Sequence, residues 1–363
     1  MEAETQRPSA GRTSDSGASP RSTLDELSAR SDLPKPSTGY LDAADGVRLR
    51  YAHWPTPEKT RQGTVLYLNG RTEFIEKTMA AYAILCRSGF DVWTFDWRGQ
   101  GLSTRALADP QKGHITDYQL FLDDLHQVIS ELIDLPDGHG KTILLGHSMG
   151  GHLGLRYLHD HPGLFDAAAF SAPMIDIPVN GAPLRALNAV IVGLGFGESY
   201  ALGTGRFRPI YDNPSDPADN GELEDYRRLI DSFEALGSDA RKRMEIERLV
   251  RDHPALALGG PTAAWLGATF RSINLTWTPG YAEAIETPVL MVSGGRDRVV
   301  IAARQEAMAK RLLNGRFHQI DKAAHELLVE CDDVRFAFFE QVAAFVDVRI
   351  DQPAIDMEGC IRR

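Results

Sequence analysis

Short apolar runs alternate with longer amphipathic segments through the first half of the chain. The runs have the length of strands, and the segments between them carry apolar residues at helical spacing. This pattern predicts strands at residues 64–68, 91–96, 142–147 and 166–171, and helices near residues 74–88, 117–134 and 150–160. Such alternation is typical of a mostly parallel sheet with helices on both faces, so we expect an α/β fold.

The pattern differs at both ends of the chain. Residues 1–37 are rich in Ser, Pro, Arg, Thr and Gly without periodicity, so we expect a disordered tail. Residues 40–54 have the pattern of a hairpin that turns at Asp45 and Gly46, which predicts an antiparallel edge to the sheet. The expected core comprises residues 38–173 and 281–348, and residues 349–363 are expected to form a C-terminal tail.

The alternation of strands and helices stops between residues 174 and 280, where we expect an inserted, largely helical cap. Its most apolar stretch, residues 186–197, is too short to cross a bilayer. This stretch would line an acyl pocket, touch a membrane surface or, in the plainer interpretation, pack the cap onto the core. A charged stretch, residues 222–251, is expected to be helical with a solvated face.

A serine lies in a glycine-rich turn at the end of one predicted strand. The apolar residues 142–145 lead into Gly-His-Ser-Met-Gly at 146–150, and an apolar helix follows. The glycines permit the close packing and strained dihedrals of a sharp strand-to-helix turn. Such a turn presents the Ser148 hydroxyl at the edge of the sheet, so Ser148 is a candidate nucleophile.

A serine nucleophile needs a base and an acid that orients the base. Asp297 follows the predicted strand at residues 287–293, and His325 follows the one at residues 316–320. The order Ser, Asp, His along the chain is the one expected for this kind of turn. We therefore predict a catalytic triad of Ser148, Asp297 and His325. Asp176, on the loop after the next strand, is an alternative acid.

The other histidines considered are weaker candidates for the base. His318 lies within a predicted strand and His147 within the serine turn, so both are expected to be packing residues. His159 and His161 flank Asp160 at a helix end, where cations suit the helix dipole. A metal site at this pair lacks a complementary cluster of ligands in the sequence, so no metal is predicted.

An oxyanion in the reaction would need two backbone N–H donors. One is expected from Met149, the residue after the nucleophile, and the other from the loop after residues 64–68. That loop reads Asn-Gly-Arg-Thr-Glu at 69–73, which makes the amide of Arg71 the candidate donor. The alternative is an ordinary turn, since Asn-Gly is a strong turn signal.

Composition narrows the range of partners. The net charge is −11, and the chain has no run of lysines and arginines, so a nucleic-acid partner is not expected. The three cysteines are scattered, and Cys86 and Cys331 fall in helical patterns as reduced packing residues. The N-terminus lacks an apolar signal segment and no run is long enough to span a bilayer, so we expect a cytoplasmic protein.

Four segments resemble the α/β-hydrolase superfamily, and within it the bacterial lysophospholipases and monoacylglycerol lipases, which are grouped with serine aminopeptidase-like hydrolases. They are Leu-Asn-Gly-Arg-Thr-Glu-Phe-Ile-Glu at 68–76, Phe-Asp-Trp-Arg-Gly-Gln-Gly-Leu-Ser at 95–103, the serine turn at 146–150, and Ser-Gly-Gly-Arg-Asp at 293–297 with His325. The second segment supports the fold, whereas the first resembles the lysophospholipase branch more narrowly. Asn69 departs from the histidine that many relatives have before the glycine.

The resemblance implies a serine hydrolase that cleaves carboxylic esters through an acyl-enzyme. It implies a small-molecule ester or lysolipid substrate. The acyl-enzyme mechanism requires no cofactor, and the apolar stretch of the cap is the candidate for transient contact with a membrane surface. An aminopeptidase, a thioesterase or a haloperoxidase-like enzyme would keep the same three residues. A non-catalytic hydrolase-fold binding protein is a further alternative. No oligomeric state is predicted.

Overall fold

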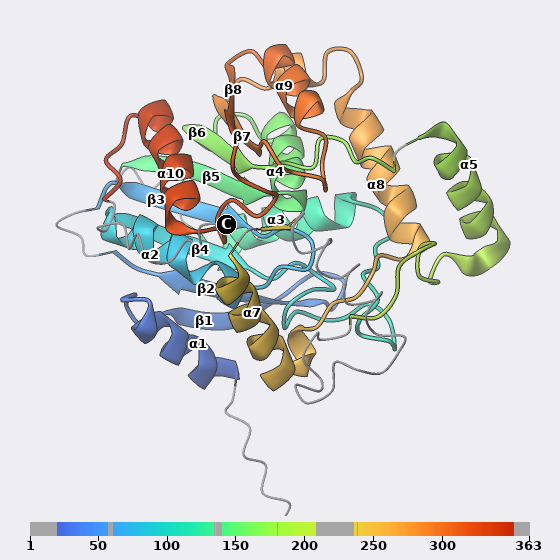
Figure 1. Ribbon diagram of the computed structural model, residues 1–363, viewed down its shortest axis with the longest axis horizontal. Helices are drawn as coiled ribbons and strands as arrows, with labels where there is room; N and C mark the ends of the chain where they lie inside the picture. Colours follow the sequence, from blue (N-terminus) through green and yellow to red (C-terminus); the bar gives the residue numbers. More distant parts are fainter. Residues whose placement is uncertain are drawn as a thin grey trace, which may run out of the picture.

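A computed structural model describes most of the chain, and Figure 1 shows how its elements are arranged. The described residues are 20–56, 61–133, 135, 140–179, 181–207, 236–237 and 239–351. They contain one eight-stranded sheet in the order β1-β2-β4-β3-β5-β6-β7-β8. Its strands are β1 (Ser37–Asp42), β2 (Arg48–Trp54), β3 (Gly63–Leu68), β4 (Phe90–Phe95), β5 (Lys141–His147), β6 (Ala167–Ser171), β7 (Val289–Gly294) and β8 (Gly315–Ile320).

The sheet is parallel from β4 to β8 and antiparallel at the β1–β2 edge. The β1–β2 hairpin pairs Leu41 with Leu49 across the expected turn, and β2 also runs antiparallel to β4. Every residue of β3, β6 and β7 is buried. Strands covered on both faces must be apolar throughout, which is why they appear in the sequence as unbroken apolar runs. The predicted α/β fold and its antiparallel edge are confirmed.

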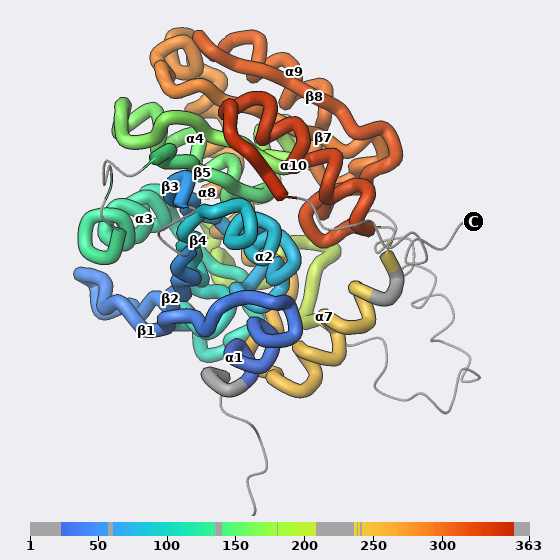
Figure 2. Tube along the Cα trace, turned by 90° about the vertical axis from the view of Figure 1, so that its left-hand side faces the viewer, coloured from blue at the N-terminus to red at the C-terminus, as the bar shows by residue number. Residues whose placement is uncertain are grey.

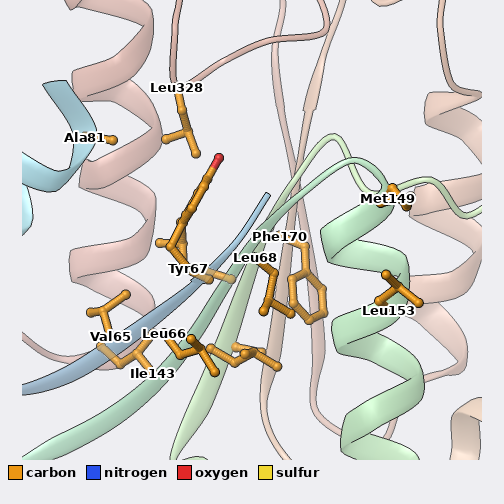
Figure 3. Packing of buried hydrophobic residues seen from close by; sticks show 14 of the residues in the cluster. Val65, Leu66, Tyr67, Leu68, Ala81, Ile143, Met149, Leu153, Phe170 and Leu328 are labelled. Atoms are coloured by element: carbon orange, nitrogen blue, oxygen red, sulfur yellow. The ribbon is translucent and has the colours of Figure 1, made fainter. Parts of the chain in front are cut away.

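Helices cover the two faces of this sheet. Figure 2 shows α2 and α10 to one side of the strands and α3 to the other. In the close view of Figure 3, Ala81 and Leu328 lie on one side of β3, and Met149 and Leu153 of α4 lie on the other. Together with η2 and α9, these helices have the bounds η2 (Ile75–Thr78), α2 (Met79–Arg87), α3 (Gln119–Leu132), α4 (Met149–Asp160), α9 (Ala302–Arg311) and α10 (Asp332–Val346).

The insertion between β6 and β7 is helical in its described parts. It holds α5 (Ala182–Ile191), η3 (Val192–Phe196), α7 (Ala240–Asp252), η4 (Pro254–Leu256), α8 (Ala263–Thr276) and η5 (Ala282–Ala284). Helix α8 rests on the core, where Ser272 and the Nε2 of His152 lie 2.6 Å apart. Of the charged stretch expected at residues 222–251, residues 240–251 lie in α7, and residues 222–235 lie outside the described residues.

The apolar stretch at residues 186–197 faces solvent, so the interpretation that it packs the cap onto the core is wrong. Val190 is 57% exposed, Leu194 69% and Phe196 58%. Helix α5 packs against α8 through a polar contact, because the buried Asn188 donates to the carbonyl oxygen of Ala263 at 3.0 Å. Figure 1 shows α5 beyond α8, at the outer edge of the molecule. The stretch therefore presents its apolar side chains outward.

The prediction of a disordered tail at residues 1–37 is wrong from Pro20 onward, and residues 1–19 lie outside the described residues. Helix α1 (Pro20–Arg30) buries Leu24, and the Nε1 of Trp54 donates to the Ser28 hydroxyl at 3.1 Å. The average composition of the segment hides the helical spacing of Leu24, Leu27 and Ser28, which places all three on one face. Burial on the core then offsets the entropy of ordering the helix.

The expected C-terminal tail begins attached to the core. The side-chain amide of Gln62 donates to the carbonyl oxygen of Arg349 at 2.7 Å, and the amide of Asp351 donates to Ser88 at 2.9 Å. Residues 352–363 lie outside the described residues. Within the described ranges, no helix has both the length and the apolar character needed to cross a membrane.

Replacing Leu24 tests the docking of α1. We expect Leu24→Ala to lower the free energy of unfolding by about 2 kcal/mol, because the change leaves a cavity beneath the helix. The exposed Glu26 on the same helix offers a matched control, and Glu26→Ala should change stability by about 0.5 kcal/mol or less. Urea denaturation measures both, and equal midpoints for the two variants would contradict the docking of α1.

Candidate active site

The turn between β5 and α4 holds Ser148 in an unusual backbone conformation. Its φ is 49° and its ψ is −113°, a strained combination for a residue with a side chain. A Cβ at Gly150 would lie 2.2 Å from the carbonyl oxygen of Leu68, and one at Gly146 would lie 2.9 Å from the amide of Gly151. Only glycine fits at these positions, and their small size lets the turn press against the end of β3.

Ser148, His325 and Asp297 form a continuous chain of hydrogen bonds. The Ser148 hydroxyl lies 3.0 Å from the Nε2 of His325, and the Nδ1 of His325 lies 2.7 Å from a carboxylate oxygen of Asp297. The other carboxylate oxygen of Asp297 accepts from the amides of Val299 at 2.8 Å and Val300 at 3.1 Å. These two amides fix the orientation of the carboxylate that contacts His325.

The three residues meet because their strands end at the same edge of the sheet. Ser148 follows β5, Asp297 follows β7 and His325 follows β8. The carboxyl ends of neighbouring parallel strands gather their loops on one side, where α/β proteins place their sites. His325 and Ser148 are 4% and 8% exposed, so little water reaches the reacting atoms.

The alternative residues lie elsewhere. Asp176 accepts from the guanidinium of Arg304 at 3.0 Å, while Asp297 occupies the position beside His325. The Nδ1 of His147 lies 3.1 Å from the carbonyl oxygen of Ser171, and burial lowers the pKa of His147 to about 4. His147 is therefore neutral near pH 7. His159 pairs with Asp160 at 2.7 Å on the last turn of α4.

Two further expectations concern His318 and metal sites. His318 lies within β8. Among the described residues, no group of histidine, cysteine and carboxylate side chains could hold a metal ion.

The amide of Arg71, in the loop after β3, has no protein acceptor among the described residues. The amide of Gly70 donates to a carboxylate oxygen of Glu73 at 2.6 Å, and the amide of Thr72 donates to Gln100 at 3.2 Å. Within the part of the chain that the structure describes, the Arg71 amide between them has no such acceptor. The amide of Met149 starts α4, where a helix leaves its first N–H groups unpaired. The two predicted donors thus come from loops that Gly150 brings into contact.

Asn69 is held by contacts within the core rather than by contacts with the site. Its side-chain amide donates to the carbonyl oxygen of Phe95 at 2.8 Å, and its carbonyl oxygen accepts from the Nε1 of Trp97 at 2.7 Å. Gln100, from the second segment of the resemblance, braces the loop because its side-chain amide donates to the carbonyl oxygen of Gly70 at 2.9 Å. That segment was expected only to support the fold, and the bracing role of Gln100 was not predicted.

A buried ion network joins the loop after β3 to the loop of His325. Lys77 lies 2.7 Å from a carboxylate oxygen of Glu326 and 3.3 Å from one of Glu73, and all three side chains are at most 7% exposed. Arg243 of α7 approaches Glu326 at 3.6 Å. Burial raises the pKa of the Glu326 carboxyl, but the charges of Lys77 and Arg243 outweigh burial and lower that pKa to about 2.

Sequence reasoning missed this network because Lys77 and Glu326 lie 249 residues apart in the chain. Glu73, three residues after Gly70, could have been recognised from the capping-like spacing of a turn followed by a carboxylate. The pairing of Lys77 with Glu326 has no local signal. Glu326 directly follows His325, and its own amide donates to the carbonyl oxygen of Leu236 at 2.7 Å, so the network also fixes the histidine loop to the cap.

The chain matches a known family over residues 59–332, the model of the serine aminopeptidase S33 hydrolases. It belongs to this family. A probable lysophospholipase L2 of Haemophilus influenzae is 29% identical over 86% of this chain and 92% of its own length. Lysophospholipase L2 of Escherichia coli is 28% identical over 83% of this chain and 84% of its own.

The fold is shared with lipases of known structure. A soluble variant of monoglyceride lipase from Saccharomyces cerevisiae superposes with a TM-score of 0.64, at 19% identity, over 86% of this chain and 95% of that one. The resemblance to the α/β-hydrolases and to their lysophospholipase and monoacylglycerol lipase branch is confirmed. The chain is a serine hydrolase of that fold.

Loss of the Lys77 charge tests the buried network. We expect Lys77→Met to lower the free energy of unfolding by about 3 kcal/mol at pH 7, because two buried carboxylates lose their counter-ion. The pKa of Glu326 is lowered from 4.5 to about 2 in the folded protein, so its contribution is present above pH 4.5 and disappears as pH falls toward 2. The variant should therefore gain less stability than the wild type between pH 3 and pH 6.

Lys310 provides the control, since it forms an exposed pair with Glu306 at 2.7 Å. Lys310→Met should cost about 0.5 kcal/mol or less, as expected for a surface pair on a helix. Urea unfolding at the two pH values measures both variants. Equal losses for Lys77→Met and Lys310→Met would show that the network does not stabilise the site.

Proposed function

We propose that the protein hydrolyses carboxylic esters through an acyl-enzyme formed on Ser148. The observation that carries this proposal is the hydrogen-bonded chain from Asp297 through His325 to Ser148. His325 takes the hydroxyl proton at Nε2 as the oxygen attacks the ester carbonyl. It then returns that proton to the departing alcohol. Asp297 holds the histidine tautomer and balances the imidazolium charge.

The amides of Met149 and Arg71 are the proposed donors to the oxyanion. They are positioned before the substrate arrives, so no reorganisation is needed as negative charge develops on the carbonyl oxygen. In the second half of the reaction, His325 takes a proton from water as the water oxygen attacks the acyl carbonyl. The bond to the Ser148 oxygen then breaks, the acid leaves, and His325 returns the proton to that oxygen. These steps use protein groups and water alone.

The proposed substrates are monoacyl lipids, either lysophospholipids or monoacylglycerols. The relatives named as lysophospholipases match over most of their own length, and those named as monoacylglycerol lipases share the family. The sheltered position of Ser148, 8% exposed, fits an ester that leaves water before it reacts. We therefore place lipid monoesters ahead of small water-soluble esters as substrates.

The exposed apolar side chains of α5 and η3 form the proposed contact with a lipid surface. Leu184, Leu187, Val190, Leu194 and Phe196 are each at least 45% exposed. An apolar surface of this kind on a surface helix favours insertion at the boundary of headgroups and acyl chains. Because the net charge is −11, apolar burial rather than attraction to anionic lipid would drive the contact.

Substitutions in the hydrogen-bonded chain test the enzymatic proposal. Ser148→Ala should abolish both the hydrolysis of a p-nitrophenyl ester and labelling by a fluorophosphonate, because the attacking oxygen is gone. Asp297→Asn should lower activity by about three to four orders of magnitude through the wrong histidine tautomer. Asp176→Asn, at the alternative acid, should have a far smaller effect. Undiminished labelling of Ser148→Ala, or the reverse ranking of the two aspartates at equal thermal stability, would refute these assignments.

Charge introduced on η3 tests the contact with lipid. We expect Leu194→Asp to weaken binding to phosphatidylcholine vesicles by about tenfold, since the variant loses the apolar side chain that would be buried in the lipid. Hydrolysis of a long-chain monoacylglycerol in those vesicles should fall with it, and hydrolysis of a soluble acetyl ester should not. Leu313→Asp is the matched control, because Leu313 is 66% exposed but lies after α9, outside the cap. Unchanged vesicle binding by Leu194→Asp would refute a contact through this surface.

A further inference from the structure

The guanidinium of Arg71 lies at the junction between the loop after β3 and the cap. Its Nη2 donates to the carbonyl oxygen of Gly259, and its Cζ lies 5.4 Å from the centre of the Trp265 ring. A Cβ at Gly113 would lie 3.0 Å from Nη2, so the absence of a side chain there leaves room for the guanidinium. The backbone of the same residue supplies the proposed oxyanion donor, so this charge lies on the side chain of the residue whose amide would meet the reacting ester.

This guanidinium has few polar partners for a charge on a half-buried side chain. Its Nε is buried without a hydrogen-bond partner, and no carboxylate pairs with it among the described residues. By contrast, Arg50 bonds to both Glu76 and Asp96, and Arg98 bonds to Asp124 at 2.6 Å.

The comparison extends to arginines without carboxylate partners. Within the described ranges Arg105 has no carboxylate partner either, but it donates to three carbonyl oxygens, those of Gly99, Gly101 and Ala255. Arg71 is therefore the less satisfied of the two, and it is the one at the active site.

The missing counter-charge has an energetic consequence. Burial lowers the pKa of Arg71 to about 10, and the group still carries its proton near neutral pH. A half-buried cation with one carbonyl partner retains part of its desolvation cost. An anion that reached this position would offset that cost and meet the unpaired Nε. The site is thus prepared for a negatively charged part of the substrate.

We propose that Arg71 binds the phosphate of a lysophospholipid headgroup and so selects phosphorylated lipids over neutral monoacylglycerols. The inference rests on the ester hydrolysis proposed above and adds a residue that sets substrate preference. A guanidinium donates two parallel hydrogen bonds to a phosphate, a geometry that suits the fork of Arg71.

The lengths of the two groups are compatible. Three glycerol carbons separate the ester oxygen of a 1-acyl lysophospholipid from its phosphate oxygen, and three methylenes separate the guanidinium of Arg71 from its Cα. The carbonyl oxygen could therefore reach the Arg71 amide while the phosphate reaches the side chain. Monoacylglycerol has the same ester and glycerol but only a hydroxyl in place of the phosphate.

The test compares two substrates with the same acyl chain, a lysophosphatidylethanolamine and a 1-monoacylglycerol, in the same mixed micelles. Both are neutral overall, so net-charge attraction to the protein is matched and the phosphoethanolamine group, which carries the phosphate, is the difference. We expect Arg71→Met to lower the ratio of kcat/KM for the lysophospholipid to that for the monoacylglycerol by about 10- to 100-fold. Arg71→Lys should restore part of the ratio, because it keeps the charge but not the fork.

Arg271 supplies the control variant. It is an exposed arginine on α8 that also donates to one carbonyl oxygen, that of Thr116 at 2.6 Å. Arg271→Met should leave the substrate ratio unchanged, whereas a comparable fall in that variant would overturn the proposal. An equal loss on both lipids in Arg71→Met would also overturn it, since it would assign Arg71 the structural role of joining its loop to Gly259.

Two further measurements separate the remaining outcomes. Inorganic phosphate should inhibit the hydrolysis of a short ester by the wild type only weakly, because it lacks the acyl chain. Strong inhibition with an unchanged lipid ratio in Arg71→Met would assign the site to free phosphate and overturn the headgroup proposal. A wild type that fluorophosphonate labels, but whose lipid ratio Arg71→Met does not change, overturns the role of Arg71 alone. A wild type that resists labelling overturns the proposed function itself.

Discussion

The close approach of the serine turn to the end of β3 is the constraint on which the site depends. Gly150 lies against the carbonyl oxygens of Leu68 and Asn69, at distances that exclude any side chain. This contact fixes two loops relative to each other, one carrying the hydroxyl of Ser148 and one carrying the amide of Arg71. The strained backbone of Ser148 follows from it. Strain of this kind persists only where the surrounding structure determines it, and here the packed ends of β3 and β5 do so.

A second layer of organisation is electrostatic. Lys77 lies between Glu73 and Glu326, so one cation joins the loop that carries the proposed oxyanion donor to the loop that carries His325. Buried ion pairs contribute little net stability compared with apolar packing, but they are specific about geometry. In this hydrolase the network links loops that are not neighbours in the sheet order, and Arg243 extends it to the cap. The cap and the loop of His325 are thereby held by the same group of charges.

The cap uses apolar and charged residues in opposite ways on its two sides. Its outer helices expose leucines and valines that a protein surface normally limits, while its inner side meets the half-buried Arg71, which has no carboxylate partner among the described residues. Each arrangement is unfavourable in the isolated protein and favourable in the presence of a monoacyl lipid, which has an apolar chain and, in lysophospholipids, a phosphate. The substrate proposed for the protein therefore has an apolar chain that could cover the exposed side chains of the cap and a phosphate that could pair with Arg71.

The α/β fold, the serine turn and the chain order of Ser148, Asp297 and His325 could be predicted from the sequence alone. Each was recognised from a local pattern, an apolar run with the loop that follows it. The order of the strands then decided that Asp297, and not Asp176, lies beside the histidine. Only the tertiary structure showed that Leu24 is buried, that residues 186–197 face solvent, and that Lys77 meets Glu326. Burial and ion pairing are settled by contacts between distant segments, and a local pattern of apolar and polar residues carries no record of which segments those are.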